Sequence, residues 1–338
     1  MRIAFYAPMK PPTSEVPSGD RQMARALMAA LRSKGHRVDL AARLASREPI
    51  GSPTRQARFA ELGDKLAQRY IRRNRPDIWF TYHLYYKAPD WIGPRVTAAL
   101  GIPYVVAEAS FAPKRAGGPW DISHRAVEAA IRRADLVFGL NPTNEPCVRQ
   151  LARSFVRLKP FLESTVFTRQ GTSDLLTVAM MRPGDKLASY RLLADILRRL
   201  PGVSLTIVGS GPAETEVRAA FAGLPATFTT EVGYGGEVFV WPAINEAYGM
   251  AILEAQAAGL PVVAGYSPGV AEIVRDGETG ILVAQNNAES FARAVGKLLA
   301  DPILRKKMGE AARARVAAEH SFEAAAELID RHIRALVP

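Results

Sequence analysis

Residues 245–265 of the chain read NEAYGMAILEAQAAGLPVVAG. The apolar run Val238–Trp241 comes just before this stretch and predicts a buried strand. A helix follows, and Gly259-Leu260-Pro261 ends it before the next apolar run. Strand, loop, helix and strand in this order are the repeating unit of a parallel α/β sheet. Function is expected in the loops at the carboxyl ends of such strands.

The same alternation of strands and helices extends along the whole sequence and predicts two parallel sheets covered by helices. The expected strands are Ile3–Ala7, Val38–Ala42, Ile78–Tyr82, Tyr104–Ala107, Leu136–Leu140, Leu175–Met180, Leu205–Val208 and Pro261–Ala264, with Val238–Trp241 as above. The expected helices are Asp20–Ser33, Arg58–Arg73, Trp91–Leu100, Ser123–Arg133, Glu145–Ala152, Ala288–Leu299, Ile303–His320 and Phe322–Leu336. Val156–Ser173, with Pro160 and Gly171, is the expected linker between the two sheets.

The composition describes a globular chain of two domains. A length of 338 residues fits two domains of roughly 150–200 residues each. No apolar stretch reaches the ~20 residues that a membrane span needs, and MRIAFYAPMKPP at the N-terminus reads as a first strand rather than a signal peptide. The single cysteine, Cys147, excludes an intrachain disulfide and a cysteine-based zinc cluster. We therefore expect a cytoplasmic protein.

The net charge of +11 is unevenly distributed along the sequence. Residues 1–160 carry a net charge of +14 and the remainder −3. Such asymmetry suggests that the first half faces an anionic partner, such as lipid headgroups, a phosphorylated acceptor or nucleic acid. The alternative is that these scattered arginines only solvate helix faces.

The loop and helix start after Val238–Trp241 carry the residues of a diphosphate site. The first-turn amides of Gly249, Met250 and Ala251 are unsatisfied donors at the positive end of a helix dipole, which favours a diphosphate. Gly249 lets the backbone approach that group closely. Glu246 is placed to reach a sugar beside the phosphate, and Glu254 to accept hydrogen bonds from ribose hydroxyls.

Glu246 and Glu254 resemble the E-x7-E motif of the retaining GT-B glycosyltransferases. The text around them, with PGVAEIVRDGETGILV at 268–283, resembles glycosyltransferase family 4 (glycosyl transferases group 1) over roughly 40 residues. The resemblance implies two Rossmann-like domains that face a central cleft. Residues 1–160 would then bind the acceptor and residues 161–320 the nucleotide sugar, while residues 321–338 would pack back on the first domain.

The same resemblance assigns roles to further residues. Arg182 and Lys186, after the expected strand Leu175–Met180, match the pair that neutralises the donor diphosphate and assists its departure, although Leu187 stands where the family usually has glycine. Charge builds on a phosphate as the glycosidic bond breaks, so cations are needed there. The glycines expected to bind the donor are Gly209 and Gly211 in one turn and Gly19 in the first domain. Ser18 or Asp20 at that place reads alternatively as a simple helix N-cap.

Two stretches depart from the family pattern. Where the family commonly has a histidine near the reacting sugar, this chain has Glu108, which with His83 is a candidate for a sugar or acceptor contact. Tyr248 stands at a frequently aromatic position. The connection Thr230–Gly236 is shorter than the helix-containing one of the family, so either that helix is trimmed or a segment is missing.

The resemblance implies transfer of a sugar from a nucleoside diphosphate sugar to a hydroxyl acceptor with retention of anomeric configuration. The acceptor is expected to be a polysaccharide or glycolipid, with peripheral contact of the first domain at the inner face of the membrane; nucleic acid is the less favoured partner. No D-x-D sequence is present, so we expect neither metal nor cofactor. A GT-B-type epimerase or phosphorylase, and a non-catalytic protein that binds anionic partners, stay open as alternatives.

Overall fold

A computed structural model describes residues 1–16, 18–162, 173–231 and 233–337 of the chain. The chain divides into two compact units, one formed by Met1–Lys159 with Phe322–Pro338 and the other by Pro160–Ser321. The boundaries expected from the sequence, after residues 160 and 320, each lie one residue from these divisions. Most of the expected linker, 163–172, falls outside the described residues.

The first unit is built on a six-stranded parallel sheet with the order β2-β1-β3-β4-β5-β6. Strand β1, next to the edge strand β2, pairs with two neighbours, so that Ile3 lies opposite both Val38 and Ile78. Its strands are β1 (Arg2–Tyr6), β2 (Arg37–Leu40), β3 (Ile78–Leu84), β4 (Tyr104–Ala109), β5 (Leu136–Gly139) and β6 (Phe155–Arg157). Because β6 was not expected, the start of the predicted linker was wrong: Val156 belongs to a strand.

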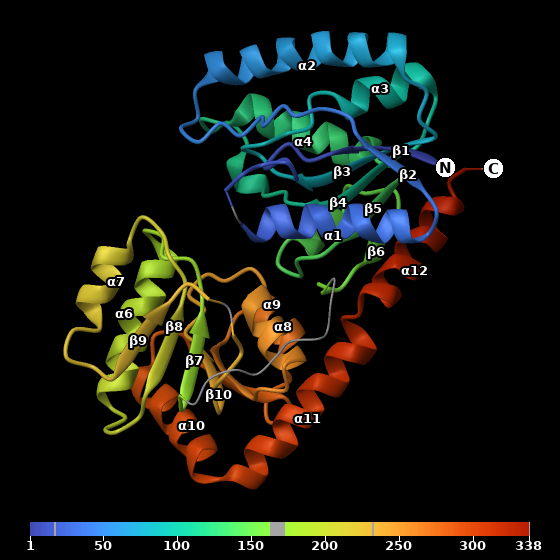
Figure 1. The fold of residues 1–338 in the computed structure, drawn as a ribbon. Helices are drawn as coiled ribbons and strands as arrows, with labels where there is room; N and C mark the ends of the chain where they lie inside the picture. The colour runs from blue at the N-terminus through green and yellow to red at the C-terminus, as the bar shows by residue number, and fades with distance from the viewer. Residues whose placement is uncertain (17, 163–172, 232, 338) are drawn as a thin grey trace. The chain divides into compact units, whose positions relative to one another are not determined.

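Helices cover both faces of this first sheet (Figure 1). The helices of the unit are α1 (Gly19–Ser33), α2 (Pro53–Arg73), α3 (Gly93–Leu100), α4 (Asp121–Arg133), α5 (Glu145–Arg149) and α12 (Phe322–Arg334), with a 3₁₀ turn at Pro113–Arg115. In the picture α2, α3 and α4 lie on one side of the sheet, and α1 and α12 on the other. The last helix of the chain therefore completes the unit that the first 159 residues begin.

Apolar and polar contacts both hold α12 against α1. The inner face of α12 buries Ile329 and Ile333 completely. At its margin Asp330 lies 2.6 Å from the Nε2 atom of His36, and Lys34 pairs with Glu327 at 2.5 Å. Burial of these isoleucines contributes about 1.5–3 kcal/mol each, whereas the exposed ion pair contributes at most ~1 kcal/mol. Apolar packing is thus the main stabilisation of this contact.

The second unit has its own parallel sheet, with the order β12-β11-β10-β7-β8-β9. Its strands are β7 (Leu175–Val178), β8 (Leu205–Val208), β9 (Ala226–Thr229), β10 (Val238–Trp241), β11 (Val262–Gly265) and β12 (Gly280–Val283). The pairing of Val240 with Val263 places β10 and β11 side by side. The expected strands at β7, β8, β10 and β11 are thus present, while β9 and β12 were not expected.

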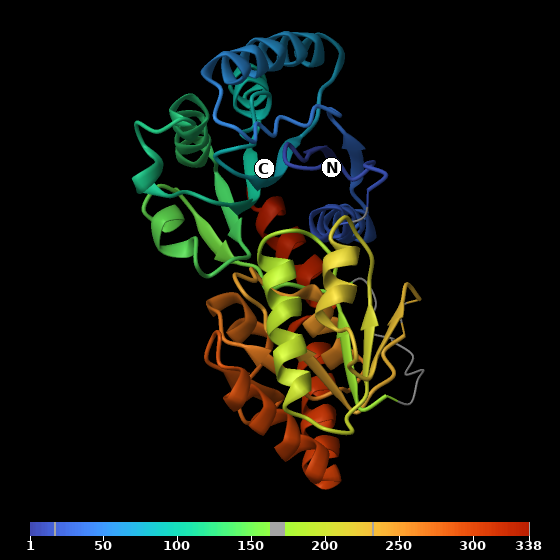
Figure 2. The ribbon, with the colours of Figure 1, turned by 90° about the vertical axis from the view of Figure 1, so that its left-hand side faces the viewer.

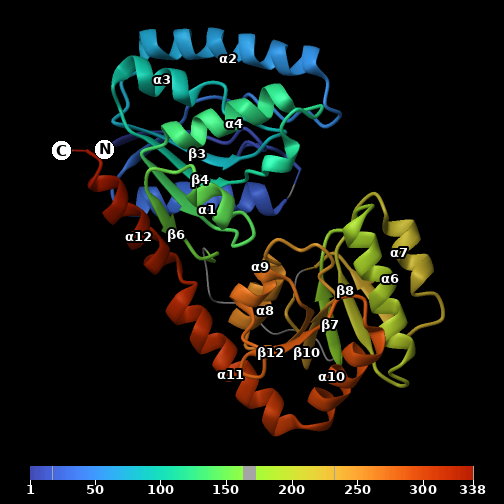
Figure 3. The same ribbon diagram turned by 180° about the vertical axis from the view of Figure 1, so that it is seen from behind.

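Six helices described in this unit cover the second sheet. They are α6 (Asp185–Arg198), α7 (Glu214–Ala220), α8 (Met250–Ala257), α9 (Pro268–Ile273), α10 (Ala288–Ala300) and α11 (Pro302–Glu319). Figure 2 shows α6 and α7 running along one face of the sheet. Figure 3 shows α8, α9 and α11 gathered on the opposite face. The loop between β10 and α8 consequently opens at the carboxyl edge of the sheet, where ligands bind in parallel α/β folds.

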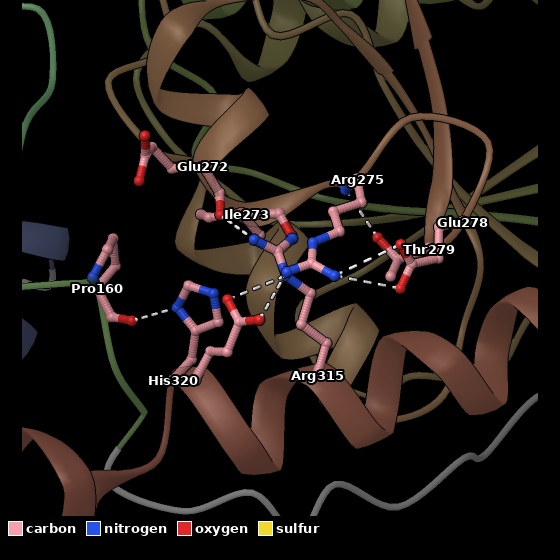
Figure 4. Close-up of polar contacts among 9 residues, drawn as sticks. Pro160, Glu272, Ile273, Arg275, Glu278, Thr279, Arg315 and His320 are labelled. Carbon is pink, nitrogen blue, oxygen red and sulfur yellow. Dashed lines mark hydrogen bonds and ion pairs between the residues drawn. The ribbon is translucent and has the colours of Figure 1, made fainter.

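A polar cluster joins the end of α11 to α9 (Figure 4). Arg315 donates to the carbonyl oxygens of Ile273 and Glu272, at 2.5 and 2.8 Å, and so satisfies the last turn of α9. Beyond α11, the Nδ1 atom of His320 lies 2.6 Å from the carbonyl oxygen of Pro160. The cluster therefore fixes both ends of the second unit's chain, where it enters at Pro160 and where α11 ends.

Candidate functional site

The predicted residues Lys186 and Glu246 meet at the carboxyl edge of the second sheet. Lys186 lies in the first turn of α6, and Glu246 in the loop after β10. The ammonium group of Lys186 and the indole Nε1 of Trp241 both donate to the Oε2 atom of Glu246, the indole at 3.1 Å. The Lys186 ammonium also lies 5.2 Å from the centre of the Trp241 ring. A cation, a carboxylate and an aromatic ring thus share one place.

Trp241 was missed by the sequence analysis as a site residue. It is the last residue of β10, and its side chain is buried. An aromatic residue that ends a buried strand is common in protein cores, so its type gives no functional signal. Its value for the site depends on the distance to Glu246, which only the folded chain provides.

The loop that carries Glu246 has an unusual backbone and is tied to α6. Ala243 and Asn245 both adopt positive φ, at 55° and 49°, which is uncommon for residues other than glycine. The Nδ2 atom of Asn245 donates to Asp185 at 3.0 Å, and the amide of Ile244 donates to Ser189 at 3.1 Å. Backbone strain of this kind concentrates at functional sites. These bonds to α6 hold the loop in its conformation.

The helix after this loop begins without a side-chain cap. Gly249 is the N-cap of α8, in the left-handed conformation with φ 75°, and no side chain in the described part of the chain caps this helix start. A Cβ atom at Gly249 would lie 2.7 Å from the Ile252 side chain, so the close turn also needs glycine for space. The amide groups of Met250 and Ala251 belong to an uncapped first turn, which is an electropositive place for an anion.

Glu254 lies within α8 and receives a hydrogen bond from a residue that the sequence analysis did not select. The hydroxyl of Tyr234 donates to the Oε2 atom of Glu254. Burial raises the pKa of the Glu254 carboxyl, and the Tyr234 hydrogen bond partly counteracts this by favouring the charged form. Burial and the nearby Glu254 charge also raise the pKa of Tyr234, so the phenol keeps its proton and acts as the donor.

The glycines at the end of β8 are required by close packing. Both have strongly positive φ, 154° for Gly209 and 152° for Gly211. A Cβ atom at Gly209 would lie 2.0 Å from the carbonyl oxygen of Ala179, and one at Gly211 would lie 2.3 Å from that of Met181. The two glycines therefore let the chain after β8 lie directly against the chain after β7. Their contact with a donor stays a prediction.

Arg182 and Tyr248, two further predicted site residues, lie in the second unit. Arg182 is exposed, and its guanidinium has neither a hydrogen bond nor an ion pair within the described segments of the chain. Tyr248 is half-buried and packs against the apolar core. Their predicted roles in leaving-group and sugar binding remain predictions.

Candidates in the first unit form a smaller cluster at the start of α1. The Nδ1 atom of His83 lies 2.8 Å from an Asp20 carboxylate oxygen. Burial works against the charged imidazolium, but the hydrogen bond and charge of Asp20 outweigh it, so the pKa of His83 is raised. Ser18 is the N-cap of α1 and accepts from the Arg21 amide at 3.3 Å. A Cβ atom at Gly19 would meet nothing within 4 Å, so the space beside it is open.

Glu108 is buried at the end of β4 and is engaged by backbone groups. Its Oε2 atom accepts from the amides of Leu140 and Asn141, at 3.1 and 3.0 Å, and its Oε1 atom accepts from the Asn144 side chain at 3.3 Å. The carboxylate therefore anchors the loop that follows β5. A contact with a sugar stays a prediction for this residue.

The described ranges offer neither a metal-ion cluster nor a membrane-spanning helix. They contain no group of three or more His, Cys, Asp or Glu side chains placed to hold a metal ion. None of the helices they contain has the length and apolar character to span a bilayer.

Part of the second unit matches a known protein family. Residues 187–315 match the family model for glycosyl transferases group 1. This group 1 segment includes Glu246, Gly249 and Glu254 and begins directly after Lys186. The family-level part of the sequence interpretation is therefore confirmed for that segment.

Two curated relatives named as sugar transferases match part of the chain. The chain is 33% identical over 136 residues to a sulfoquinovosyl transferase of Arabidopsis thaliana, covering 37% of this chain and 27% of the relative. It is 38% identical over 142 residues to a GDP-mannose-dependent α-(1-6)-phosphatidylinositol monomannoside mannosyltransferase of Mycolicibacterium smegmatis, covering 36% of this chain and 37% of that one. The matched stretch thus spans well under half the length of these relatives.

Solved structures resemble the chain over nearly its whole length. A sucrose-phosphate synthase from Thermosynechococcus elongatus has a TM-score of 0.77 at 21% identity and covers 99% of this chain and 98% of its own. Anabaena HepE, solved in complex with UDP, has a TM-score of 0.76 at 15% identity and covers 99% and 100%. These likenesses, with the two parallel six-stranded sheets, confirm the predicted α/β fold of GT-B type.

Proposed function

We propose that the chain is a glycosyltransferase that moves a sugar from a nucleoside diphosphate sugar to a hydroxyl acceptor with retention of anomeric configuration. The observation that carries this proposal is the meeting of Lys186, Glu246 and the uncapped start of α8 at one sheet edge. The group 1 match over residues 187–315 supports it, as does the name of a structural neighbour solved with UDP.

In this proposal the diphosphate lies at the start of α8. The amides of Gly249–Ala251 and the ammonium of Lys186 would stabilise the negative charge that grows on the leaving diphosphate as the glycosidic bond breaks. Arg182, an exposed residue shortly before α6 in the sequence, would add a second cation. Without a donor, Lys186 is paired with Glu246. When a diphosphate binds, the Lys186 ammonium would contact both the diphosphate and the Glu246 carboxylate.

Retention is proposed to follow from substitution on the front face of the sugar. The departing phosphate would accept the proton of the acceptor hydroxyl as the new bond forms, so no covalent sugar on the enzyme is needed. Glu246, held by Trp241 and Lys186, would orient sugar hydroxyls instead of attacking the anomeric carbon. Neither a metal nor a cofactor takes part in this scheme. Detection of a covalent sugar on Glu246 would contradict it.

The acceptor and the place of action are proposed from charge and from the relatives. The exposed side of α2 carries many cations, including Arg58, Arg69, Arg72 and Arg73. Such a surface attracts anionic lipid headgroups, and one relative is named for a phosphatidylinositol mannoside acceptor. We therefore propose a glycolipid or polysaccharide acceptor, reached at the cytoplasmic face of a membrane.

The donor site can be tested by nucleotide binding. Thermal shift and calorimetry with UDP, GDP and ADP, in buffer that contains EDTA, are expected to show that one nucleotide class binds and stabilises the wild-type chain. Lys186→Ala is expected to weaken this binding about tenfold or more, because a charge-assisted contact with the diphosphate is lost. Glu246→Gln is expected to reduce turnover of the sugar nucleotide with a smaller effect on nucleotide affinity.

Arg293→Ala is the matched control, because this cation lies on an exposed face of α10, where it pairs with exposed Glu289 and donates to the Ser290 hydroxyl. It is expected to leave nucleotide binding unchanged. A folded wild-type chain that binds none of the three nucleotides would contradict the proposed function. Conversion of the sugar nucleotide without any acceptor would indicate an epimerase, and the anomeric configuration of the product, read by NMR, tests retention.

A further inference from the structure

Tyr234 and Glu254 form a buried pair that the mechanism above does not use. Tyr234 is 2% exposed, and it lies in the short connection between β9 and β10. Its hydroxyl reaches Oε2 of Glu254, five residues into α8. The other carboxylate oxygen, Oε1, has no hydrogen-bond partner in the described part of the chain, and the Glu254 side chain is half-buried. One oxygen is thus held by Tyr234, and the other is not engaged by a described residue.

The surroundings of Glu254 leave Tyr234 as the polar group that acts on it. The neighbouring strands β10 and β11 read VFVW and VVAG and carry no charged side chains. On α11, Arg313 is engaged with the carbonyl oxygen of Ala258, at the far end of α8, at 2.9 Å. Among the described residues, the Tyr234 hydroxyl is the side-chain partner that lowers the pKa of Glu254, against the burial that raises it.

We propose that Tyr234 is a positioning residue for the nucleotide, because its hydroxyl holds Glu254 as an oriented carboxylate whose free oxygen accepts hydrogen bonds from the ribose diol. This inference rests on the proposed donor site. The chemistry fits the requirement: a diol donates to a carboxylate, whereas a protonated carboxyl has lost part of its accepting capacity. Tyr234 is suited to this role because burial keeps its phenol protonated and hence always a donor.

The sign of the expected pH effect follows from the burial of Glu254. Without the Tyr234 hydrogen bond, nothing offsets the desolvation of the carboxylate, so its pKa rises further above the usual range. The side chain then becomes neutral at a higher pH. The acid limb of nucleotide affinity, where binding weakens as the pH falls, should therefore move to higher pH in Tyr234→Phe. Loss of one charge-assisted hydrogen bond corresponds to a shift of about one pH unit.

The first measurement is the affinity for the nucleoside diphosphate that binds the wild-type chain, between pH 5 and pH 8. Tyr234→Phe is expected to weaken binding about tenfold at low pH, with a smaller loss at pH 8, while Glu254→Gln removes the acid limb altogether. Tyr6→Phe is the matched control, because its hydroxyl donates to the carbonyl oxygen of Leu44 in the first unit, at 2.9 Å. It is expected to leave the midpoint of the acid limb unchanged.

The second measurement needs no ligand. Folding raises the pKa of the Glu254 carboxyl. Such a group stabilises the native state most at a pH below its pKa in the unfolded chain, and this stabilisation is lost as the pH rises through its pKa in the folded chain. The loss of stability in Tyr234→Phe should accordingly grow from pH 5 to pH 8. In a Glu254→Gln background this pH dependence should disappear.

The outcomes separate the two hypotheses. An unchanged acid limb in Tyr234→Phe would overturn the positioning role. Tighter nucleotide binding in that variant would also overturn it, because it would show that the Tyr234 hydroxyl competes with the ligand for Glu254. If the wild-type chain binds no nucleotide while the stability measurement still couples Tyr234 to Glu254, the pair is structural, and it is the proposed donor site that fails.

Discussion

At the scale of single residues, Gly269 controls how closely α9 approaches the loop that carries Glu246. A Cβ atom at this position would lie 1.5 Å from the carbonyl oxygen of Ala247. This oxygen belongs to the backbone, so a change of side-chain rotamer cannot relieve the clash. The hydroxyl of Ser267, the N-cap of α9, donates to the carbonyl oxygen of Glu246 at 3.0 Å. The start of α9 is thus part of the support of the candidate site.

We therefore expect Gly269→Ala to displace α9 or the loop, to lower the free energy of unfolding by about 1–3 kcal/mol and to weaken nucleotide binding. Chemical denaturation and calorimetry measure the two effects. Gly296→Ala is the control: this glycine lies inside α10 with open space around it, and alanine there should stabilise by up to ~1 kcal/mol. Equal stability of Gly269→Ala and the wild-type chain would show that the loop yields freely.

Sequence reasoning at this scale identified residues whose signal is local. Glu246 and Glu254 could be selected because their spacing and the glycines around them lie within one short stretch. Tyr234 and Trp241 could not, because each acts through a contact with a glutamate farther along the chain, 20 residues away for Tyr234. A tyrosine between two strands has no property in the sequence that distinguishes a carboxylate partner from ordinary packing.

At the scale of secondary-structure elements, most strands that the sequence predicted are buried on both faces; β2, a partly exposed edge strand, is the exception. β10 and β11 are entirely buried, and each reads as a continuous apolar run. The three strands that were missed, β6, β9 and β12, lie at sheet edges and are only partly buried. An edge strand needs fewer apolar residues than a central one, and the missed strands are short: β6 reads FVR and β9 reads ATFT, although β12 reads GILV. Three of the four edge strands, with β2 as the exception, were therefore not recognised from the apolar pattern.

The attachment of α9 to α11 is a second element-scale feature, and it depends on one arginine. The Arg315 side chain is 9% exposed; besides its two bonds to α9 it pairs with Glu319, which also receives Arg275 at 2.9 Å. Arg315→Ala would leave the last carbonyls of a buried helix end without donors and is expected to cost about 2–3 kcal/mol of unfolding free energy.

Arg293→Ala serves again as the comparison, because its ion pair is exposed and its loss should change stability by less than ~0.5 kcal/mol. Denaturation of both variants, followed by hydrogen exchange of residues 268–283, measures the effect and its location. Exchange in α9 should accelerate in Arg315→Ala alone. A loss of stability without faster exchange there would contradict the role of Arg315 in holding α9.

At the scale of the whole molecule, the first unit is assembled from both ends of the chain. Its sheet comes from residues 1–159, yet α12 supplies part of its apolar cover. Ile329 is completely buried in α12, whereas Ile303 at the start of α11 is 82% exposed. The two positions are only 26 residues apart, but they belong to different units. Truncation of Ile329 would remove buried apolar contacts, whereas truncation of Ile303 would remove few.

This connectivity makes a prediction about where damage near the C-terminus is felt. Ile329→Ala is expected to lower unfolding free energy by about 2–4 kcal/mol, because it removes buried methyl groups and leaves a cavity, and to accelerate hydrogen exchange in α1 and β1, which lie some 300 residues earlier in the sequence. Ile303→Ala should change neither quantity, since its side chain already faces solvent. Hydrogen exchange followed by mass spectrometry distinguishes the units by their peptides. If the faster exchange of Ile329→Ala fell on residues 173–321, α12 would owe its stability to the second unit, and the first 159 residues would have to fold without it.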